Sequence, residues 1–364
     1  MRTSTKRNRA NALGNLCSAS DFRKRALAVD TGDRARLWTV VLAGGEGKRL
    51  QPLTRALYGT ALPKQFAVLS GELSLLQATV ERAACLVPLR RVLVIVCAAH
   101  EQLASKQLER YRGVELMVQP RNLDTAPGIL LPLSRILSKD PSARVVILPS
   151  DHHLSEPAPF VRAIRLAAEA SREESDGLTL LGAVPESPET EYGWIVPGPA
   201  LRDSHREVRP VERFVEKPPE ALARRLFEGG GLWNTFVSAG TASAYWALAS
   251  RHLPGLTADL ESHARIGDLT EAARALEVIY SRTASVNFSR AILERALDLR
   301  VVPVAASGWS DWGSPQRVLR SLTGSPALSA LLARLGSTLA PVQDGHGTRQ
   351  SQIPDASVAC EVPA

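Results

Sequence analysis

The first half of the chain alternates short apolar runs with longer stretches of helical spacing. An apolar run of about four to eight residues that ends at glycine, proline or polar residues is typical of a buried strand. Such runs occupy residues 38–43, 91–98, 114–118 and 144–148, and helical patterns lie between them at 74–87, 100–110 and 126–138. Strands and helices in this order build parallel sheets with helices on both faces. We predict an α/β fold, Rossmann-like, in three α/β/α layers, with a mostly parallel mixed central sheet.

The pattern becomes less regular after residue 155. Helical spacing predicts helices at 160–170, 240–251 and 257–278, and apolar runs predict strands at 178–184, 211–215 and 232–238. No segment repeats at a fixed period, so the second half predicts further strands and helices and no repeat architecture.

The two ends of the chain differ from its body. Residues 1–36 have no sustained periodicity, and the stretch from residue 337 onward contains Pro, Gly and Gln in a pattern typical of loose chain. We therefore expect a disordered basic leader at 1–36, a folded body at 37–320 and a short helical or loose tail at 321–364.

Charge is concentrated in the leader. The 364 residues carry a net charge of +7, and the leader, with nine cations and three acids, accounts for +6 of it. Taken alone, +7 would suggest a polyanionic partner, but a near-neutral body removes that argument, so we predict no nucleic-acid partner. No apolar run reaches the ~18 residues that cross a bilayer, and the leader lacks the apolar segment of a signal peptide. We expect no membrane partner and a cytoplasmic location.

The sequence shows no sign of a zinc or disulfide framework. The four cysteines have no CxxC spacing, and the seven histidines are scattered. We expect structural, reduced thiols in a protein whose 45% hydrophobic composition excludes a disordered chain.

A glycine-rich turn follows the first predicted strand. Its sequence, from Leu42 to Leu50, is LAGGEGKRL, which matches neither the P-loop nor GxGxxG. Its glycines Gly44, Gly45 and Gly47 still allow the backbone to approach a ligand closely, and Arg49 adds a cation suited to phosphate oxygens. On the glycines alone, an ordinary strand-to-helix turn remains equally open.

The residues that follow change this balance. The turn continues into Pro52-Leu53-Thr54 and then Pro63-Lys64-Gln65-Phe66. GGxGxRLxPLT followed by PKQF resembles the signature of sugar-phosphate nucleotidyltransferases, and the PKQF form is most like that of the mannose-1-phosphate guanylyltransferases. The resemblance continues through QP at 119–120, TAP at 125–127, LPSDH at 148–152, YGWI at 192–195, FVEKP at 214–218, WNTF at 233–236 and WSDWG at 309–313. It implies that residues 37–320 form a nucleotidyltransferase catalytic domain.

The resemblance implies the transfer of a guanylyl group from GTP to mannose 1-phosphate, which gives GDP-mannose and releases pyrophosphate. Two anions must then be held together, so catalysis depends on positioning and charge neutralisation. The family motifs place Arg49 and Lys64 in catalytic, phosphate-binding roles. They also imply Mg²⁺ at Asp151 and Asp311, although each aspartate alone would be read as a helix cap or a turn residue.

The same resemblance assigns the binding residues. It gives the nucleotide to Gly44, Gly45, Gly47, Gln119 and Thr125. It gives the sugar phosphate to Gly193, Glu216, Lys217 and Asn234.

Two positions depart from the family pattern. Asp124 stands where the family usually has Asn, and Asn287 stands where it usually has Asp. A carboxylate at 124 could alter base preference, and the loss of charge at 287 leaves that residue's ion pair or sugar contact open.

Other functions stay open from the sequence. The same chemistry could use UTP or dTTP with glucose 1-phosphate, or the chain could be a non-catalytic sugar-nucleotide-binding regulatory subunit. Roughly 44 residues after position 320 are too few for the second catalytic module that some relatives carry, so we expect a single activity. The sequence is compatible with a homodimer.

Overall fold

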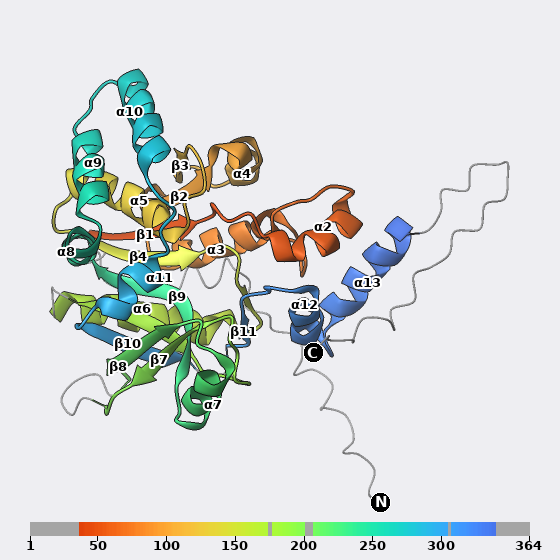
Figure 1. Cartoon of the computed structure of the whole chain (residues 1–364). Coiled ribbons are helices and arrows are strands. Elements are labelled where there is room, and N and C mark those ends of the chain that lie inside the picture. The colour runs from red at the N-terminus through yellow and green to blue at the C-terminus, as the bar shows by residue number, and fades with distance from the viewer. Residues whose placement is uncertain (1–35, 174–176, 201–206, 305–306, 340–364) are drawn as a thin grey trace, which may run out of the picture.

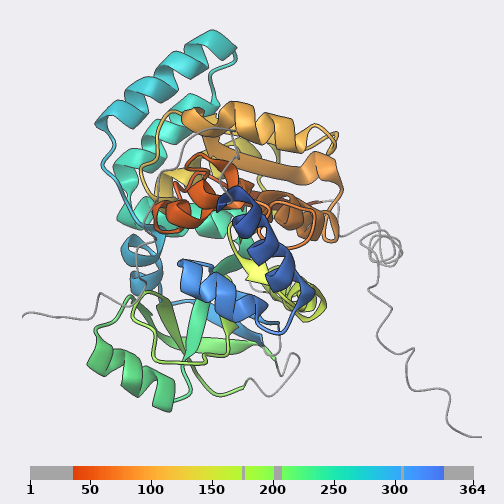
Figure 2. The same cartoon turned by 90° about the vertical axis from the view of Figure 1, so that its right-hand side faces the viewer.

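The computed structural model of the chain describes residues 36–173, 177–200, 207–304 and 307–339 (Figures 1 and 2). The strands are β1 (Leu37–Leu42), β2 (Val92–Cys97), β3 (Glu115–Gln119), β4 (Arg144–Pro149), β5 (His153–Leu154), β6 (Leu178–Ala183), β7 (Gly193–Pro197), β8 (Arg209–Glu216), β9 (Leu232–Thr241), β10 (Leu299–Val304) and β11 (Trp309–Ser310). The α-helices are α2 (Gln51–Tyr58), α3 (Leu75–Ala84), α4 (Glu101–Leu108), α5 (Thr125–Lys139), α6 (Pro157–Glu173), α7 (Glu220–Glu228), α8 (Ala242–His252), α9 (Pro254–Ala264), α10 (Leu269–Arg282), α11 (Phe288–Ala291), α12 (Pro315–Leu322) and α13 (Pro326–Leu339).

A mixed sheet forms the centre of the fold. Its nine strands follow the order β3-β2-β1-β4-β9-β6-β10-β8-β7, and β7 also pairs with β9. The pairings make β8 and β9 run against the other strands of this sheet. The predicted α/β class with a mostly parallel mixed sheet is therefore confirmed. Because β7 bonds to both β8 and β9, the second half of the sheet closes on itself beside the open first half.

Neighbouring residues of the buried strands face different cores. Val41 and Val146 belong to a core with α3, α4 and α6, whereas Val40 and Val145 belong to a core with α5, α8, α9 and α10. Side chains alternate across a strand, so a strand buried on both faces must be apolar at every position. This requirement explains why these strands appear in the sequence as continuous apolar runs.

One predicted helix is wrong in its extent. The spacing over 257–278 predicts a single helix, but the structure has α9 and α10 with a break at residues 265–268. Gly267 and Asp268 cause the break, because the carboxylate of Asp268 accepts a hydrogen bond from the backbone N–H of Glu271 and caps the second helix. Helical periodicity continues across the break, so apolar spacing alone did not reveal it.

The C-terminal helices pack onto the beginning of the domain. A third apolar cluster joins Leu50 and Leu53, at and after the glycine-rich turn, to Trp312, Val318 of α12 and Leu331 of α13. The expected boundary at residue 320 falls inside α12. Apart from Arg36, the predicted leader lies outside the described residues, as does the tail beyond residue 339. No helix in the described ranges is both long and apolar enough to span a bilayer.

This third cluster makes a stability prediction. Leu331 is 1% exposed in the cluster, whereas its neighbour Leu332 is 50% exposed. Leu331→Ala should lower the free energy of unfolding by about 2–5 kcal/mol, because it removes buried methyl groups and leaves a cavity. Leu332→Ala should change it by less than about 0.5 kcal/mol. Urea denaturation of both variants measures the difference, and equal losses would contradict the packing of α13 on α2.

Candidate active site

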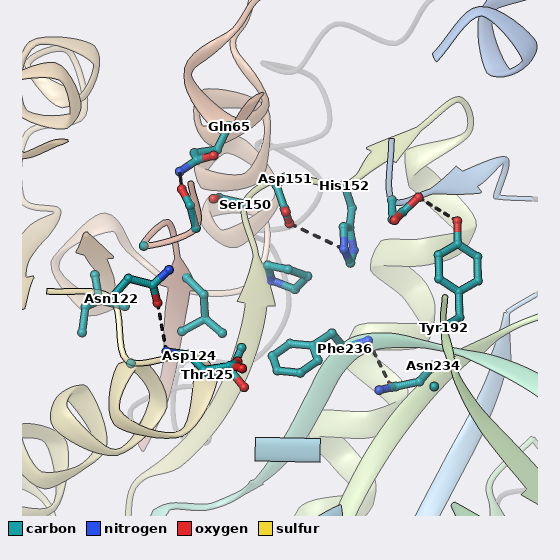
Figure 3. A pocket seen from close by; sticks show the side chains of 18 of the residues that line it. Gln65, Asn122, Asp124, Thr125, Ser150, Asp151, His152, Tyr192, Asn234 and Phe236 are labelled. Atoms are coloured by element: carbon teal, nitrogen blue, oxygen red, sulfur yellow. Dashed lines mark hydrogen bonds and ion pairs between the residues drawn. The ribbon is translucent and has the colours of Figure 1, made fainter. Parts of the chain in front are cut away.

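Two adjoining cavities open at the carboxyl ends of the parallel strands. The larger, of about 460 Å³, lies beyond β1, β3 and β4, and its lining includes Gln119. Asp151 and Asn234 also line it (Figure 3). The smaller, of about 410 Å³, is lined by the glycine-rich turn, Arg49 and Lys64, and shares Asp151 with the first. The carboxyl edge of an open α/β sheet is where ligands bind in this class of fold.

The glycine-rich turn is held by the segment that carries Lys64. The amide of Gln65 donates hydrogen bonds to the carbonyls of Ala43 (3.0 Å) and Gly45 (2.6 Å). Gly47 has φ +59°, and a side chain there would begin 2.8 Å from the backbone nitrogen of Lys64. Only glycine satisfies both conditions without strain. The two motifs, separate in the sequence, therefore form one structural unit.

Lys64 connects the two predicted metal ligands. Its side chain is 10% exposed. The ammonium lies 3.1 Å from the carboxylate of Asp151 and donates a 2.5 Å hydrogen bond to the backbone carbonyl of Asp311. Burial raises the pKa of Asp151, but the charge and hydrogen bond of Lys64, together with the charge of His152, hold this pKa below its ordinary value. Asp151 is therefore ionised at neutral pH.

The carboxylate of Asp311 is held from three directions. One oxygen accepts hydrogen bonds from the Tyr192 hydroxyl (2.7 Å), the backbone N–H of Gly313 (2.9 Å) and the guanidinium of Arg317 (3.0 Å). Burial raises its pKa, but Lys64 first, and then Tyr192 and Arg317, lower the pKa below its ordinary value. The second oxygen is 3.9 Å from Arg49. Asp311 is thus a fixed anion on the wall of the larger cavity.

Tryptophans fix the backbone around both aspartates. The ring of Trp312 is fully buried, stacks on His153 with centroids 4.1 Å apart, and its backbone has a strained φ of +45°. The indole N–H of Trp309 donates to Nδ1 of His152, whose Nε2 lies 3.5 Å from the Asp151 carboxylate. The imidazole is thereby oriented with its second nitrogen toward Asp151.

Two arginine–glutamate pairs hold the segment before β7 against this centre. Arg49 is 2.6 Å from Glu191, and Arg317 is 2.7 Å from Glu189. The first pair is half-exposed and lies where the cavities meet, whereas Arg317 is largely buried. Sequence reasoning missed Arg317, Glu189 and Glu191, because nothing in their local pattern distinguishes them from surface charges.

Three of the four predicted sugar-binding residues, Gly193, Glu216 and Asn234, meet at the other end of the larger cavity. A side chain on Gly193 would begin 2.8 Å from the carboxylate of Glu216 and 3.2 Å from the Cβ atom of Asn234, so any larger residue would displace the Glu216 carboxylate. Burial and the charge of Glu294 raise the pKa of Glu216. The amide oxygen of Asn234 accepts a hydrogen bond from the backbone N–H of Phe236.

Phe236 and Lys217 are placed differently from the sequence expectations. Phe236, which the sequence did not single out, lines the cavity with a strained φ of +60° (Figure 3). Lys217 also has a positive φ, of +50°, and its backbone N–H donates to the carbonyl of Tyr192. Its side chain is exposed and lines neither cavity. Its role toward a sugar phosphate stays a prediction.

Comparison with known proteins agrees with this arrangement. A family model described as Nucleotidyl transferase matches residues 38–323, which is most of the chain. The chain belongs to the nucleotidyl transferase family.

Individual relatives of this nucleotidyl transferase carry related names. It is 34% identical over 281 residues to Xanthan biosynthesis protein XanB of Xanthomonas campestris pv. campestris (strain B100), covering 76% of this chain and 57% of that protein. It is 31% identical over 282 residues to a mannose-1-phosphate guanylyltransferase of Klebsiella pneumoniae, covering 76% and 58%. The chain thus spans just over half the length of these curated relatives.

A solved structure from Thermus thermophilus, described as a mannose-1-phosphate geranyltransferase, matches with a TM-score of 0.69. It is 32% identical in sequence, and the match covers 80% of each chain. The Rossmann-like nucleotidyltransferase fold expected from the motifs is therefore confirmed for this chain.

The carboxylates of Asp151 and Asp311 suit a divalent cation. Magnesium in phosphate-transfer sites is held by one or two carboxylates, with substrate phosphates and water completing its shell. Both aspartates are ionised and line the larger cavity, and the Lys64 ammonium contacts the carboxylate of Asp151 and the backbone carbonyl of Asp311. In the described ranges, no group of three or more His, Cys, Asp or Glu could hold a metal alone. The donor set therefore fits a magnesium ion whose remaining ligands come from a phosphate substrate and water.

The two departures from the family pattern contact each other. The amide nitrogen of Asn287 donates a 3.2 Å hydrogen bond to the carboxylate of Asp124, which also accepts from the backbone N–H of Thr125. Asp124 has φ 65°, a conformation that non-glycine residues rarely adopt. The hydroxyl of Thr125 accepts from the N–H of Phe288, so the start of α5 is bonded to the start of α11. The family's usual pattern has the amide at position 124 and the carboxylate at position 287. This chain has the same two groups with their positions exchanged.

This exchange predicts coupled mutational effects. Asn287→Asp places a second carboxylate beside Asp124 and should lower the free energy of unfolding and weaken nucleotide binding. Adding Asp124→Asn restores an amide–carboxylate pair and should recover at least half of the loss, with a coupling energy of about 1 kcal/mol. Urea denaturation of the two single variants and the double variant measures the coupling. If the loss of stability in the double variant equals the sum of the losses in the two single variants, the two residues do not interact.

Proposed function

We propose that the protein transfers a guanylyl group from GTP to mannose 1-phosphate, with GDP-mannose and pyrophosphate as products. The observation that carries this proposal is the Lys64 ammonium between Asp151 and Asp311, where the two cavities meet. The glycine-rich turn lies on one side of this centre, and Gly193, with Glu216 and Asn234, lies on the other. The name of the Klebsiella relative supports the choice of substrates.

The reaction requires two anionic substrates in line. An oxygen of the sugar phosphate attacks the α-phosphorus of GTP, and the bond to the β-phosphate oxygen breaks as pyrophosphate leaves. Most of the acceleration then comes from holding the phosphates close and neutralising their charge. The backbone of Gly45 and Gly47 can approach the triphosphate closely, since neither residue carries a side chain. Arg49 is half-exposed beside Glu191, so its guanidinium can exchange this partner for the leaving pyrophosphate.

Lys64 has the more constrained role. It is buried and fixed by Asp151 and the Asp311 carbonyl, so its charge is available at one place, where the two substrates meet. Asp151 and Asp311 would hold the magnesium ion, which when bound neutralises charge on the phosphates. Tyr192 and Arg317 keep Asp311 ionised and correctly oriented.

The sugar end of the cavity offers both acceptors and donors for hydroxyl groups. Asn234 has its amide oxygen bonded to the backbone of Phe236, which leaves its amide N–H groups toward the cavity as donors. Glu216 supplies carboxylate acceptors beside Gly193, which also lines the cavity. These groups, with the ring of Phe236, form a pocket of a size and polarity that suits a hexose phosphate.

The proposal predicts pyrophosphate release from a defined substrate pair. The protein with GTP, mannose 1-phosphate and Mg²⁺ should release pyrophosphate in a coupled assay. A panel that replaces GTP by UTP or dTTP, and mannose 1-phosphate by glucose 1-phosphate, tests specificity. Higher turnover with another pair would change the assigned substrates, and release with no pair under any divalent metal would contradict a transferase. GDP-mannose binding without turnover would instead indicate a regulatory subunit.

The two aspartates are the sharpest test of the catalytic centre. Asp151→Asn and Asp311→Asn keep the side-chain shape but remove the charge, so turnover should fall by about a hundredfold or more. Circular dichroism should show both variants folded. Asp140→Asn, at the end of α5 and outside both cavities, is the matched control and should retain wild-type turnover. Wild-type activity in either of the first two variants would refute its assignment.

A further inference from the structure

Gln119 lies on the floor of the larger cavity at the end of β3, inside a chain of buried hydrogen bonds. Its amide oxygen accepts from the hydroxyl of Tyr280 at 3.1 Å, and its amide nitrogen donates to the Cys97 sulfur at 3.3 Å. The thiol in turn donates to the carbonyl of Gly44 at 3.2 Å. Gln119 is 2% exposed and Tyr280 is 1% exposed. The orientation of this amide is therefore set by partners that water does not replace.

These contacts leave one group of the amide for a ligand. The oxygen is occupied by Tyr280 and one N–H by Cys97, and no partner for the second N–H is found in the part of the chain that the structure describes. The amide nitrogen lies 2.5 Å from the point where a side chain on Gly44 would begin. The absence of that side chain keeps this donor at the cavity wall.

Tyr280 determines which end of the amide faces the cavity. A glutamine amide can rotate by half a turn and exchange donor for acceptor, unless its partners distinguish the two ends. Burial raises the pKa of Tyr280, so the hydroxyl keeps its proton, and the nearest acceptor for that proton is the Gln119 amide oxygen at 3.1 Å. The carbonyl of Pro127, at 3.5 Å, is a longer second acceptor for the same proton. The Tyr280 hydroxyl thus favours an oxygen, and disfavours an NH₂ group, on its side of Gln119.

We propose that Tyr280 is a positioning residue for base selection, which holds the Gln119 N–H toward the nucleotide so that the site prefers a purine with a 6-oxo group. A donor at this place pairs with the carbonyl of guanine and meets the amino group of adenine as a second donor. The proposal rests on the proposed nucleotidyl transfer only in placing a nucleotide in this cavity. It assigns a specificity role to α10, which carries none of the sequence motifs.

The test is the ratio of nucleotide preferences in Tyr280→Phe. This variant keeps the buried ring and removes only the hydroxyl, so Gln119 becomes free to rotate. The ratio of kcat/KM for GTP over ATP should fall by about tenfold, because a tenfold change corresponds to the free energy of about one buried hydrogen bond. ITP has the 6-oxo group but lacks the 2-amino group, so its kcat/KM should fall in parallel with that of GTP.

Tyr245→Phe is the matched control. Tyr245 belongs to the same apolar core, is fully buried, and its hydroxyl donates a 2.7 Å hydrogen bond to Ser238 rather than to the cavity wall. Both variants lose one buried hydroxyl, so a merely structural role for Tyr280 would give them similar effects. The Tyr245 variant should keep the wild-type GTP/ATP ratio. An unchanged ratio in Tyr280→Phe, or an equal change in Tyr245→Phe, would overturn the proposal.

Binding measurements separate this inference from the proposed reaction. Calorimetric titration of GTP, ITP and ATP in the absence of a sugar phosphate gives the corresponding ratio of affinities without any turnover. If transfer to mannose 1-phosphate fails but the binding ratio falls in Tyr280→Phe, the proposed function is wrong and the inference stands. If turnover is normal but neither ratio changes, the inference is wrong alone. Gln119→Glu, which replaces the donor with an oxygen, should lose the preference for GTP even in a background where Tyr280 is intact.

Discussion

The buried ammonium of Lys64 is the constraint around which the rest of the domain is arranged. A charge removed from water is tolerated only when opposite charge and hydrogen-bond acceptors surround it. Here the acceptors are the Asp151 carboxylate and the Asp311 carbonyl, which are separated by 160 positions in the chain. After the last strand of the sheet, the segment that carries Asp311 must therefore pack against the early segment that carries Lys64. The third apolar cluster, in which α12 and α13 pack against α2, stabilises this return.

This arrangement gives each cavity wall a different degree of rigidity. The wall formed by Asp151 and Asp311 is fixed by charge pairs, a stacked tryptophan and backbone hydrogen bonds. The wall formed by Arg49 and Glu191 is a half-exposed ion pair, which is weak in water and easily exchanged. The proposed transfer of a nucleotidyl group would need both kinds of wall, one to hold the aspartates in place and one to exchange partners with the phosphates. The rigid wall is the buried one, and the exchangeable wall is the one that water reaches.

Much of the fold could be predicted, because the signals that define it are local. Buried parallel strands must be apolar on both faces, so the strand near residue 40 and the one near 146 were visible as continuous runs. The glycine-rich turn was visible because its geometry excludes side chains. The break before α10 was not, since apolar spacing continues across it. Arg317, Glu191 and Tyr280 were also missed. Glu191 and Tyr280 contact partners that are close in space but distant in sequence. Arg317 contacts the nearby Asp311, but nothing in its local sequence distinguishes it from a surface charge.

The pair formed by Asp124 and Asn287 shows what the site preserves. Read singly, each residue is a departure from the family motif, one gaining a charge and the other losing one. In the structure they share one hydrogen bond, so the pair retains one carboxylate and one amide. The connection between the starts of α5 and α11 thus depends on one amide donor facing one carboxylate acceptor. Either residue of the pair can supply either group. The start of α5 and the segment leading into α11 also hold Thr125 and Ser285 at the cavity wall. Exchange within the pair is therefore compatible with the same cavity wall, because the constraint acts on the pair and not on either residue alone.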